Sequence, residues 1–578
     1  MHCDVLILGG GPAGSTTGTL LKKYNPNLNV VILEREKFPR DHIGESQLPA
    51  ICEVLDEMGV WDKVEEAEFP IKVGATYRWG TTDEFWHLNF LFDEEFKDQQ
   101  RPAKYKGQRR VTAFQVDRSV YDKILLDHAA EMGCQVYQEV RALKVNKDGD
   151  TVTSIDIAPN ETDLKDVTSI TAKYYVDATG NSGMLRRAMG VEIDSPTNLR
   201  NIAIWDYWQN AEWAVNIGVG GTRIQVMSLG WGWIWFIPLS ATRTSIGLVT
   251  PAEHYKKSGK KPEQLYLEAL ASEPLIGKLT SRAEREHKFT TTNDWSYLAD
   301  RLCGDNWFLV GDSCGFADPI LSAGMTLAHT AGRRVAYSIL ELERGRIKSD
   351  WIKETYTESQ RAQIRHHIRF ADFWYSANTR FTELKENCSA IAKHAGLTLE
   401  ADAAFQWMST GGFTNDNLGS AQAGTFSMSA MKAMAAEFTN GAINWQISTN
   451  NQFKMNLAGA SEGVIAHLEN GEIIPIKCFY RDDKKLPVYG LYKIVYTAVL
   501  QESDGQKLVD YFRNFFSVNN RMYKNPEVGV YNALQTMESM VVEGWIRASV
   551  NSKRPFLNVK SGGLPRSVDA IHQEFTNR

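Results

Sequence analysis

The feature that most constrains the fold stands at the start of the chain, where an apolar run leads straight into a glycine-rich turn. Residues 3–8 predict a short buried strand, and residues 9–14 read Gly-Gly-Gly-Pro-Ala-Gly. A helix is predicted at residues 13–23 and a second strand at residues 29–33. This order of strand, glycine turn, helix and strand is typical of dinucleotide-binding sites, so it predicts an α/β domain on a parallel sheet.

The residues of this turn have different predicted roles in binding a dinucleotide. Gly9 makes the tight turn, Gly11 lets the backbone approach a pyrophosphate, and Gly14 lets the helix pack closely on the strand. Pro12 and Ala13 begin the helix, whose N-terminus faces the phosphates. All five are therefore predicted to bind the cofactor.

Two charged residues lie where they can contact the same cofactor. Glu34 follows the second strand about twenty residues after the last glycine, where a carboxylate accepts hydrogen bonds from ribose hydroxyls. Arg118 precedes an amphipathic helix predicted at residues 121–132 and is expected to reach the cofactor. The alternative for Arg118 is a surface ion pair with Asp122.

Two later motifs indicate that the dinucleotide is FAD. Asp177-Ala178-Thr179-Gly180 and Gly311-Asp312 each follow a predicted strand, at residues 172–176 and 307–310. They resemble the ATG and GD motifs of the glutathione-reductase-type FAD-binding fold. The resemblance implies that Asp177, Gly311 and Asp312 contribute to the flavin site.

Length and composition set the remaining bounds. The 578 residues predict an FAD-binding core at 1–350, with a β-sheet substrate region inserted at roughly 190–300, and a mainly helical C-terminal region at 351–578. A formal net charge of −6 argues against a nucleic-acid partner, and no apolar run is long enough to span a membrane. The seven cysteines form no CxxC pair and show no metal-ligand spacing, which favours the cytoplasm and predicts no metal.

The C-terminal region mixes two patterns. Helices are predicted at residues 350–375 and 427–438, and strand-like pieces at 472–480 and 489–496. No chemistry follows from the sequence of residues 380–578.

An aromatic segment at residues 231–238 reads Trp-Gly-Trp-Ile-Trp-Phe-Ile-Pro. In an extended strand the indoles of Trp231, Trp233 and Trp235 point to the same face, and Pro238 should end the strand or confine it to a sheet edge. By itself this segment is a buried aromatic strand.

One lysine interrupts an otherwise apolar segment at residues 69–75. Lysine is mostly exposed, so a surface position with a snorkelling side chain is one interpretation of Lys72. The other is a desolvated amine with a lowered pKa, able to act as a nucleophile or as a hydrogen-bond donor.

Taken together, these motifs resemble those of the flavin-dependent halogenases. Trp233-x-Trp235-x-Ile237-Pro238 matches the family's WxWxIP motif, and Lys72 stands where the family keeps its active-site lysine. Phe316-x-x-Pro319-x-x-Ser322-x-Gly324 is similar to the family's halide loop. The motifs occur in the family's order across roughly residues 4–330.

The resemblance implies a reaction and a division of roles. Reduced FAD and O2 oxidise a halide to hypohalous acid, which passes to Lys72, where it is held by a hydrogen bond or stored as a haloamine. The halide-binding residues would be Ser322, Ala323 and Gly324, with Gly324 and Met325 also at the flavin. Trp233, Trp235, Ile237 and Pro238 would separate the flavin from the substrate and exclude water.

The resemblance also implies partners. A separate flavin reductase would deliver the reduced flavin, and the substrate would be a small electron-rich aromatic molecule, free or carrier-bound. The oligomeric state stays open, a homo-oligomer included.

The chain departs from the tryptophan halogenases at Leu321, where those enzymes carry a catalytic glutamate. This favours the branch that acts on phenols, pyrroles or carrier-bound acyl groups. The alternatives are an aromatic-hydroxylase-type FAD monooxygenase, a geranylgeranyl-reductase-like flavoprotein and a non-catalytic flavoprotein. The segment Thr179–Arg186 lacks two residues of the hydroxylase pattern, which argues against the first of these.

Overall fold

The glycine-rich turn connects β1 (His2–Leu8) to α1 (Pro12–Tyr24), as the sequence predicts. The computed structural model describes residues 1–79, 85–91, 96–97, 99–160, 167–195, 200–214, 221–293, 296–376, 445–482, 484–519 and 526–557. The predicted strand at 29–33 is β2 (Val30–Leu33), and it pairs with β1 in parallel. Gly9 adopts a φ of +105°, and a Cβ on Gly14 would lie 2.0 Å from the Gly9 carbonyl oxygen. Both positions therefore require glycine.

A seven-stranded sheet carries this turn at its centre. The strand order is β6-β2-β1-β9-β8-β7, with β18 paired to β9, and the five strands around β1 are parallel. Its other members are β6 (Gln135–Tyr137), β7 (Val140–Asp148), β8 (Thr151–Pro159), β9 (Thr168–Asp177) and β18 (Trp307–Leu309).

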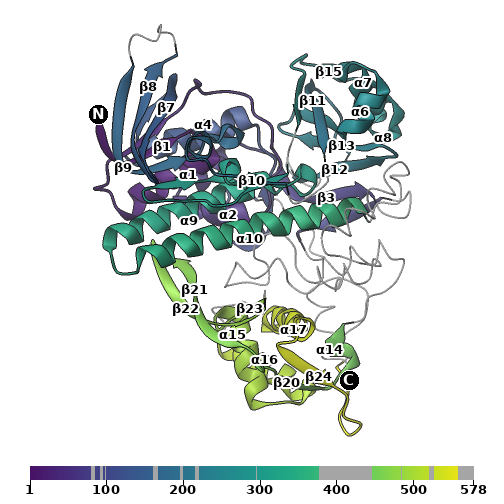
Figure 1. Cartoon of the computed structure of the whole chain (residues 1–578). Coiled ribbons are helices and arrows are strands. Elements are labelled where there is room, and N and C mark those ends of the chain that lie inside the picture. The colour runs from purple at the N-terminus through teal and green to yellow at the C-terminus, as the bar shows by residue number, and fades with distance from the viewer. Residues whose placement is uncertain are drawn as a thin grey trace.

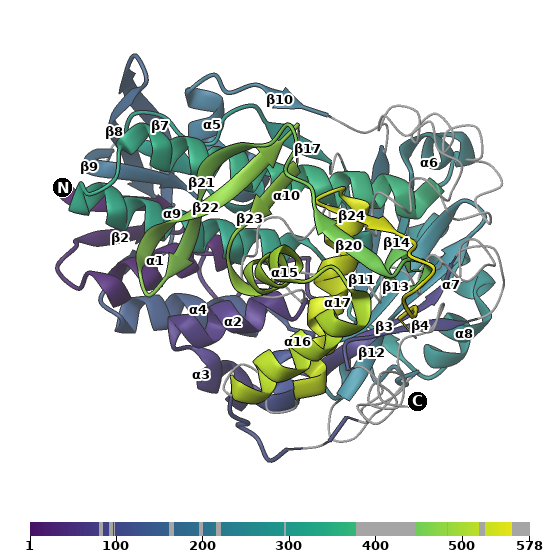
Figure 2. The same cartoon turned by 90° about the horizontal axis from the view of Figure 1, so that it is seen from below.

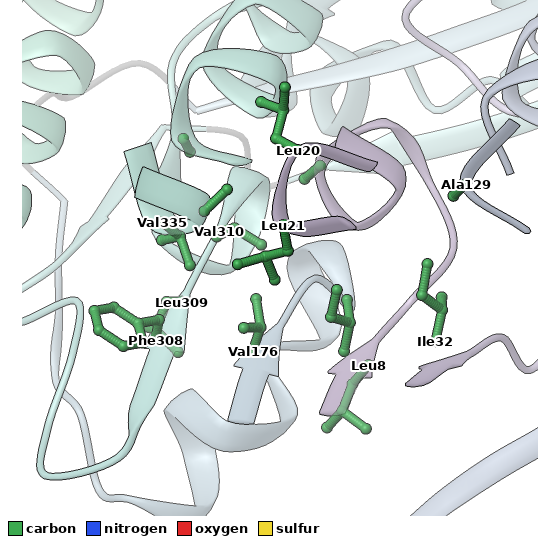
Figure 3. Packing of buried hydrophobic residues seen from close by; sticks show 14 of the residues in the cluster. Leu8, Leu20, Leu21, Ile32, Ala129, Val176, Phe308, Leu309, Val310 and Val335 are labelled. Atoms are coloured by element: carbon green, nitrogen blue, oxygen red, sulfur yellow. The ribbon is translucent and has the colours of Figure 1, made fainter. Parts of the chain in front are cut away.

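Helices pack against this sheet. Figure 3 shows Leu21 of α1 close to Val176 of β9 and Val335 of α9 (Gly324–Arg344), all three in one buried cluster. The helices around it include α2 (Ala50–Met58), α3 (Trp61–Glu66), α4 (Arg118–Glu131) and α5 (Met184–Ala188), of which α4 and α5 contact its strands. The helix predicted at residues 121–132 is confirmed by α4.

A nine-stranded sheet is the second large sheet of the molecule. Its order is β15-β11-β14-β13-β12-β3-β4, with β16 on β11 and β5 on β3. The strands are β3 (Ile71–Arg78), β4 (Trp86–Asn89), β5 (Ala113–Phe114), β11 (Asn201–Gln209), β12 (Gly221–Leu229), β13 (Gly232–Pro238), β14 (Arg243–Pro251), β15 (Glu284–Arg285) and β16 (Thr290–Asn293). A small sheet of β10 (Ile193–Asp194), β17 (Tyr297–Ala299) and β19 (Gly315–Phe316) stands apart from both large sheets.

The tryptophan strand lies inside this sheet. β13 is paired on both sides, with β12 and β14, and ends at Pro238, so it is not an edge strand. Ile234 and Phe236 belong to the core under α6 (Ala252–Ser258), α7 (Pro262–Ser272) and α8 (Pro274–Leu279). Since side chains alternate along a strand, Trp233 and Trp235 occupy the opposite face.

Two long helices run beneath both large sheets (Figure 1). They are α9 and α10 (Ser349–Ser376), which pack side by side, and α10 confirms the helix predicted at 350–375. The beginning of α9 contributes residues to the site described below.

The described C-terminal residues have a core of their own, with Val495, Phe512 and Met537 at its centre. Its helices are α14 (Gln446–Thr449), α15 (Gly490–Gln501), α16 (Gly505–Val518) and α17 (Pro526–Val542). Its strands are β20 (Gln452–Met455), β21 (Ser461–Glu469), β22 (Glu472–Arg481), β23 (Lys484–Pro487) and β24 (Ile546–Ser549).

The β21–β22 hairpin crosses α9 and α10 in the view from below (Figure 2), and Arg333 of α9 donates to the Leu468 carbonyl at 3.1 Å. The strand predicted at 472–480 is confirmed by β22. The strand predicted at 489–496 is wrong, because its apolar residues recur at helical spacing and form the buried face of α15. The helix predicted at 427–438 lies outside the described residues.

Candidate active site

A cavity of about 1140 Å³ extends from the glycine-rich turn to the tryptophan strand. It is lined by most residues that the sequence singled out, namely Gly9, Gly11, Pro12, Ala13, Glu34, Arg118, Trp233, Trp235, Ile237, Gly311, Asp312, Ser322, Gly324 and Met325. Within the described part of the chain, the predicted residues that do not line it are Gly14, Lys72, Asp177, Pro238 and Ala323. The fold thus gathers four distant segments around one space.

The end of the cavity at the glycine-rich turn is suited to a dinucleotide. The Glu34 carboxylate is fixed by two backbone donors, Gly10 N at 2.8 Å and Glu36 N at 2.9 Å. A Cβ on Gly11 would lie 3.7 Å from Nη2 of Arg40, so this guanidinium faces the turn. Nη1 of Arg40 pairs with Oδ2 of Asp122 at 3.4 Å and donates no hydrogen bond within the described part of the chain. The backbone amides of a helix N-terminus and a guanidinium beside Gly11 are donors that suit a pyrophosphate, so the residues fit FAD.

Arg118 forms the ion pair with Asp122 that the sequence offered as an alternative, but the pair is buried. Its Nε and Nη2 donate to the carboxylate at 2.6 and 2.8 Å, and its Nη1 donates to the Ile43 and Gly44 carbonyls. Burial alone would raise the pKa of Asp122, yet the Arg118 guanidinium holds that pKa below its usual value. Arg118 therefore both lines the cavity and fixes the loop that borders it.

Two acidic residues of the FAD motifs have different surroundings. Asp312 lines the cavity, and burial raises the pKa of its carboxyl to about 6. The carboxylate of Asp177 instead accepts hydrogen bonds from the backbone of Thr179, Leu185 and Arg186, so it holds its own turn together. The structure does not bring the Asp177 side chain to the cavity.

The tryptophans form one wall of the cavity. The Trp233 and Trp235 rings lie 6.0 Å apart, and Nε1 of Trp235 donates to Oγ of Ser245 at 3.1 Å. A Cβ on Gly247 would lie 2.1 Å from the Trp235 ring, so the indole occupies the space that this glycine leaves. Trp231 precedes the strand and stacks on His254, which corrects the prediction that it shares the face of the other two.

Lys72 lies behind the cavity, on β3, and is 2% exposed. Its Nζ donates to the Gln47 carbonyl at 2.9 Å and to Oγ of Ser322 at 3.4 Å, and lies 5.5 Å from the centre of the Phe90 ring. Burial lowers the pKa of the Lys72 amine to about 7. The interpretation as a surface lysine is wrong, and Ser322 is the residue that contacts both Lys72 and the cavity.

The loop that carries Ser322 turns sharply before α9. A short 3-10 helix, Pro319–Leu321, ends at Ser322, whose φ of +59° is left-handed. Ala323 is buried and α9 begins at Gly324, so the helix N-terminus lies at this turn. A Cβ on Gly324 would lie 2.9 Å from the Phe316 ring, which requires a small residue there. The free N–H groups and dipole of a helix N-terminus favour an anion.

Several cavity residues had no role in the sequence analysis. Arg40, Asp41 and Glu45 belong to the loop that follows β2, and each lines the cavity. The sequence shows Phe38-Pro39-Arg40 at the start of this loop. No residue spacing indicates that Arg40 comes to lie beside Gly11 in the glycine turn. Among the described residues, no cluster of three or more metal-ligating side chains occurs, and no helix is long and apolar enough to cross a membrane.

Comparisons with known proteins agree with this site. The FAD binding domain family matches residues 2–371. The chain is 31% identical over 392 residues to the 1H-pyrrole-2-carbonyl-(peptidyl-carrier protein) chlorinase of Pseudomonas fluorescens, covering 66% of this chain and 85% of that protein. It is 32% identical over 387 residues to the tryptophan 2-halogenase of Chondromyces crocatus, covering 65% and 68% of the two chains.

Solved structures extend the likeness to the C-terminal region. The flavin-dependent halogenase CmlS superposes with a TM-score of 0.70 at 22% identity, over 97% of this chain and 98% of that one. This second likeness shows the shared fold alone. Together with the family match and the two relatives, the cavity and its motifs show that the chain belongs to the flavin-dependent halogenases, enzymes that use FAD, O2 and a halide ion.

Proposed function

We propose that this halogenase works through Lys72, which receives an oxidised halogen from the cavity and transfers it to an electron-rich aromatic or enolisable carbon. The observation that carries the proposal is the position of the amine. The amine is buried behind the cavity and contacts Ser322, which also lines the cavity. Bound reduced FAD would supply, with O2, the oxidation of halide to hypohalous acid.

The halide would lie at the turn formed by Ser322, Ala323 and Gly324. The left-handed Ser322 and the start of α9 direct backbone N–H groups to this turn. Because these donors belong to the backbone, they discriminate weakly among halides. Bromide and iodide are also easier to oxidise than chloride, so we expect them to be accepted at least as readily.

The step at Lys72 needs the neutral amine, which a pKa near 7 makes available. The nitrogen lone pair attacks the halogen of hypohalous acid, the N–X bond forms as the X–O bond breaks, and the released hydroxide takes the amine proton to form water. The substrate carbon then attacks the halogen, loses its own proton and regenerates the amine. Hypohalous acid is consumed, and halogenated product and water result.

The tryptophan wall would keep the two reactions apart. Trp233 and Trp235 are 2% and 4% exposed and face the cavity. Their indoles would separate the flavin from an organic substrate, whereas hypohalous acid is small enough to pass. Apolar walls also keep water from the oxidant.

The proposal includes a partner enzyme and a cellular compartment. A separate flavin reductase would deliver reduced FAD to the chain. Both proteins would work in the cytoplasm. The similarity to a chlorinase of carrier-bound pyrrole and to a tryptophan halogenase supports a small aromatic substrate, free or carrier-bound.

The test is a halide and substrate screen with mass-spectrometric detection. The purified chain receives FAD, a flavin reductase, NADH, O2, one halide and one phenol, indole or pyrrole, offered free or on a carrier protein. Halide-dependent halogenated product supports the proposal. Hydroxylated product from the chain with NADPH alone would support the monooxygenase alternative instead.

A further inference from the structure

A hydrogen-bond chain outside the halogenase motifs connects the tryptophan wall to the loop that carries Ser322. Nε1 of Trp233 donates to the Tyr375 hydroxyl at 2.7 Å, and this hydroxyl lies 3.1 and 3.2 Å from the two carboxylate oxygens of Asp318. The three side chains are 2–3% exposed. They come from β13, from the last turn of α10 and from the residue before Pro319. One hydroxyl therefore holds three separate segments in one arrangement.

The Asp318 end of this chain is fixed to the protein from two further sides. Its Oδ1 accepts from the backbone N of Ile320 at 2.9 Å, and its Oδ2 accepts from Nδ2 of Asn201 on β11 at 3.3 Å. A buried carboxyl is stable only when donors surround it, and burial raises the pKa of this one to about 6. Without the Tyr375 hydroxyl, Asp318 would lose a donor and the 316–324 loop would lose a support.

The Trp233 end is the part of the wall nearest to α10. The Trp79 ring lies 6.5 Å from the ring of Trp233 and 5.7 Å from the ring of Tyr375, so the hydroxyl sits within an aromatic cluster. A buried indole N–H needs an acceptor, and in this apolar cluster the Tyr375 hydroxyl provides it. A change at Tyr375 would let the indole turn toward another acceptor and alter the cavity wall.

We propose that Tyr375 is a positioning residue for halogenation, whose hydroxyl fixes the Trp233 indole and the Ser322 loop against each other. The oxidant then leaves the cavity past Ser322 toward Lys72 and is not lost to solvent or to side reactions. This inference rests on the proposed function. It adds a residue at the end of α10, far from the sequence motifs.

The primary test compares Tyr375→Phe with the wild type. We expect the halogenated product formed per NADH consumed to fall about tenfold, the effect of one lost buried hydrogen bond, with the difference appearing as hydrogen peroxide. The dissociation constant of FAD should stay within about twofold, because Tyr375 does not line the cavity. Unchanged coupling in Tyr375→Phe would overturn the proposal.

Tyr337→Phe provides a matched control. Tyr337 is a fully buried tyrosine of α9 whose hydroxyl donates to Oε1 of Glu57 at 2.6 Å, away from the cavity. Its removal should lower thermal stability as Tyr375→Phe does but leave the coupling unchanged. An equal loss of coupling in Tyr337→Phe would show a general packing effect and overturn the positioning role.

A double-mutant cycle tests whether the hydroxyl acts through the indole. Trp233→Phe removes the N–H, and adding Tyr375→Phe to it should lower the coupling by less than about threefold further. If the losses of coupling caused by Tyr375→Phe and Trp233→Phe are additive, the Tyr375 hydroxyl does not act through the Trp233 indole.

A physical readout separates this inference from the proposed function. Tyr375→Phe should change the near-ultraviolet circular dichroism of the tryptophans in the flavin-free protein, and Tyr337→Phe should change it less. Identical spectra for wild type and Tyr375→Phe would overturn the positioning role whether or not the enzyme halogenates. A wild type that halogenates no substrate, with the spectral change present, would reject the proposed function alone.

Discussion

Nζ of Lys72 lies 3.4 Å from Oγ of Ser322, although 250 residues separate them in the chain. Ser322 lines the cavity and Lys72 does not, so the serine is the physical link between the two. The strand β3 supplies the lysine and the turn before α9 supplies the serine. This contact links the lining of the cavity to the buried amine.

The pH dependence of halogenation should show which form of Lys72 acts. Burial lowers the pKa of the amine to about 7, so the neutral form grows as the pH rises through 7. If Lys72 is the nucleophile, the halogenation rate in single turnovers rises from pH 6 to pH 8 and then levels off. A rate that falls over this range would contradict the haloamine and favour the protonated amine as a hydrogen-bond donor.

Arg40 should bind the pyrophosphate of FAD. Its guanidinium faces Gly11 and pairs with Asp122 at 3.4 Å, and charged hydrogen bonds to phosphate are strong. We expect Arg40→Met to raise the dissociation constant of FAD roughly tenfold to a hundredfold, measured by flavin fluorescence. Lys37→Gln is the matched control, because Lys37 is exposed and pairs with Glu139. Equal FAD affinities of wild type and Arg40→Met would refute the assignment.

The dinucleotide half of the site could be predicted from the sequence because it depends on short local spacing. Gly9, Gly14 and Glu34 lie within one βαβ unit, and local geometry fixes their roles. Gly11 and Asp312 lie on the cavity as expected. For Trp233 and Trp235, strand alternation correctly predicted a shared face.

Other features depend on tertiary contacts that no spacing reveals. The burial of Lys72 follows from the Gln47 loop and the Ser322 turn, both remote in sequence. Asp177 was assigned to the flavin from its motif, but its carboxylate serves its own turn. Tyr375 belongs to an ordinary amphipathic helix pattern and acquires its contacts because α10 ends beside the tryptophan wall.

The tryptophan wall should depend on Gly247 as much as on Trp235. Gly247→Ala would drive its Cβ into the Trp235 ring, and a displaced group of this kind costs roughly tenfold to a hundredfold in rate. We expect Gly247→Ala and Trp235→Ala to form less halogenated product and more hydrogen peroxide at a similar rate of NADH consumption. Gly277→Ala is the control, since its Cβ would meet nothing closer than 3.8 Å. A wild-type product yield from both wall variants would remove the tryptophans from the mechanism.

The loop over the cavity should be fastened by Asp41. Its carboxylate pairs with Arg243 at 3.1 Å and with Lys288 at 3.0 Å, joining the loop after β2 to the nine-stranded sheet. Partly exposed pairs are weak and screened by salt, so Asp41→Asn should speed FAD release only about threefold, and high salt should shrink this difference. The rate of FAD release is measured by stopped flow as the transfer of FAD to an excess of a second apoprotein. Glu253→Gln, which removes an exposed ion pair, is the control. If the rate of FAD release changes neither with Asp41→Asn nor with salt, the ion pairs of Asp41 do not hold the loop in place.

The most direct test of the account is the Lys72→Ala variant in the complete assay with FAD, flavin reductase, NADH, O2, bromide and an activated phenol. We predict that brominated product falls by about a thousandfold, because the substitution removes the amine from its buried position beside Ser322. FAD binding and NADH consumption should persist, since Lys72 does not line the cavity. If Lys72→Ala brominates as fast as the wild type, the oxidant does not pass through this lysine and the account is wrong.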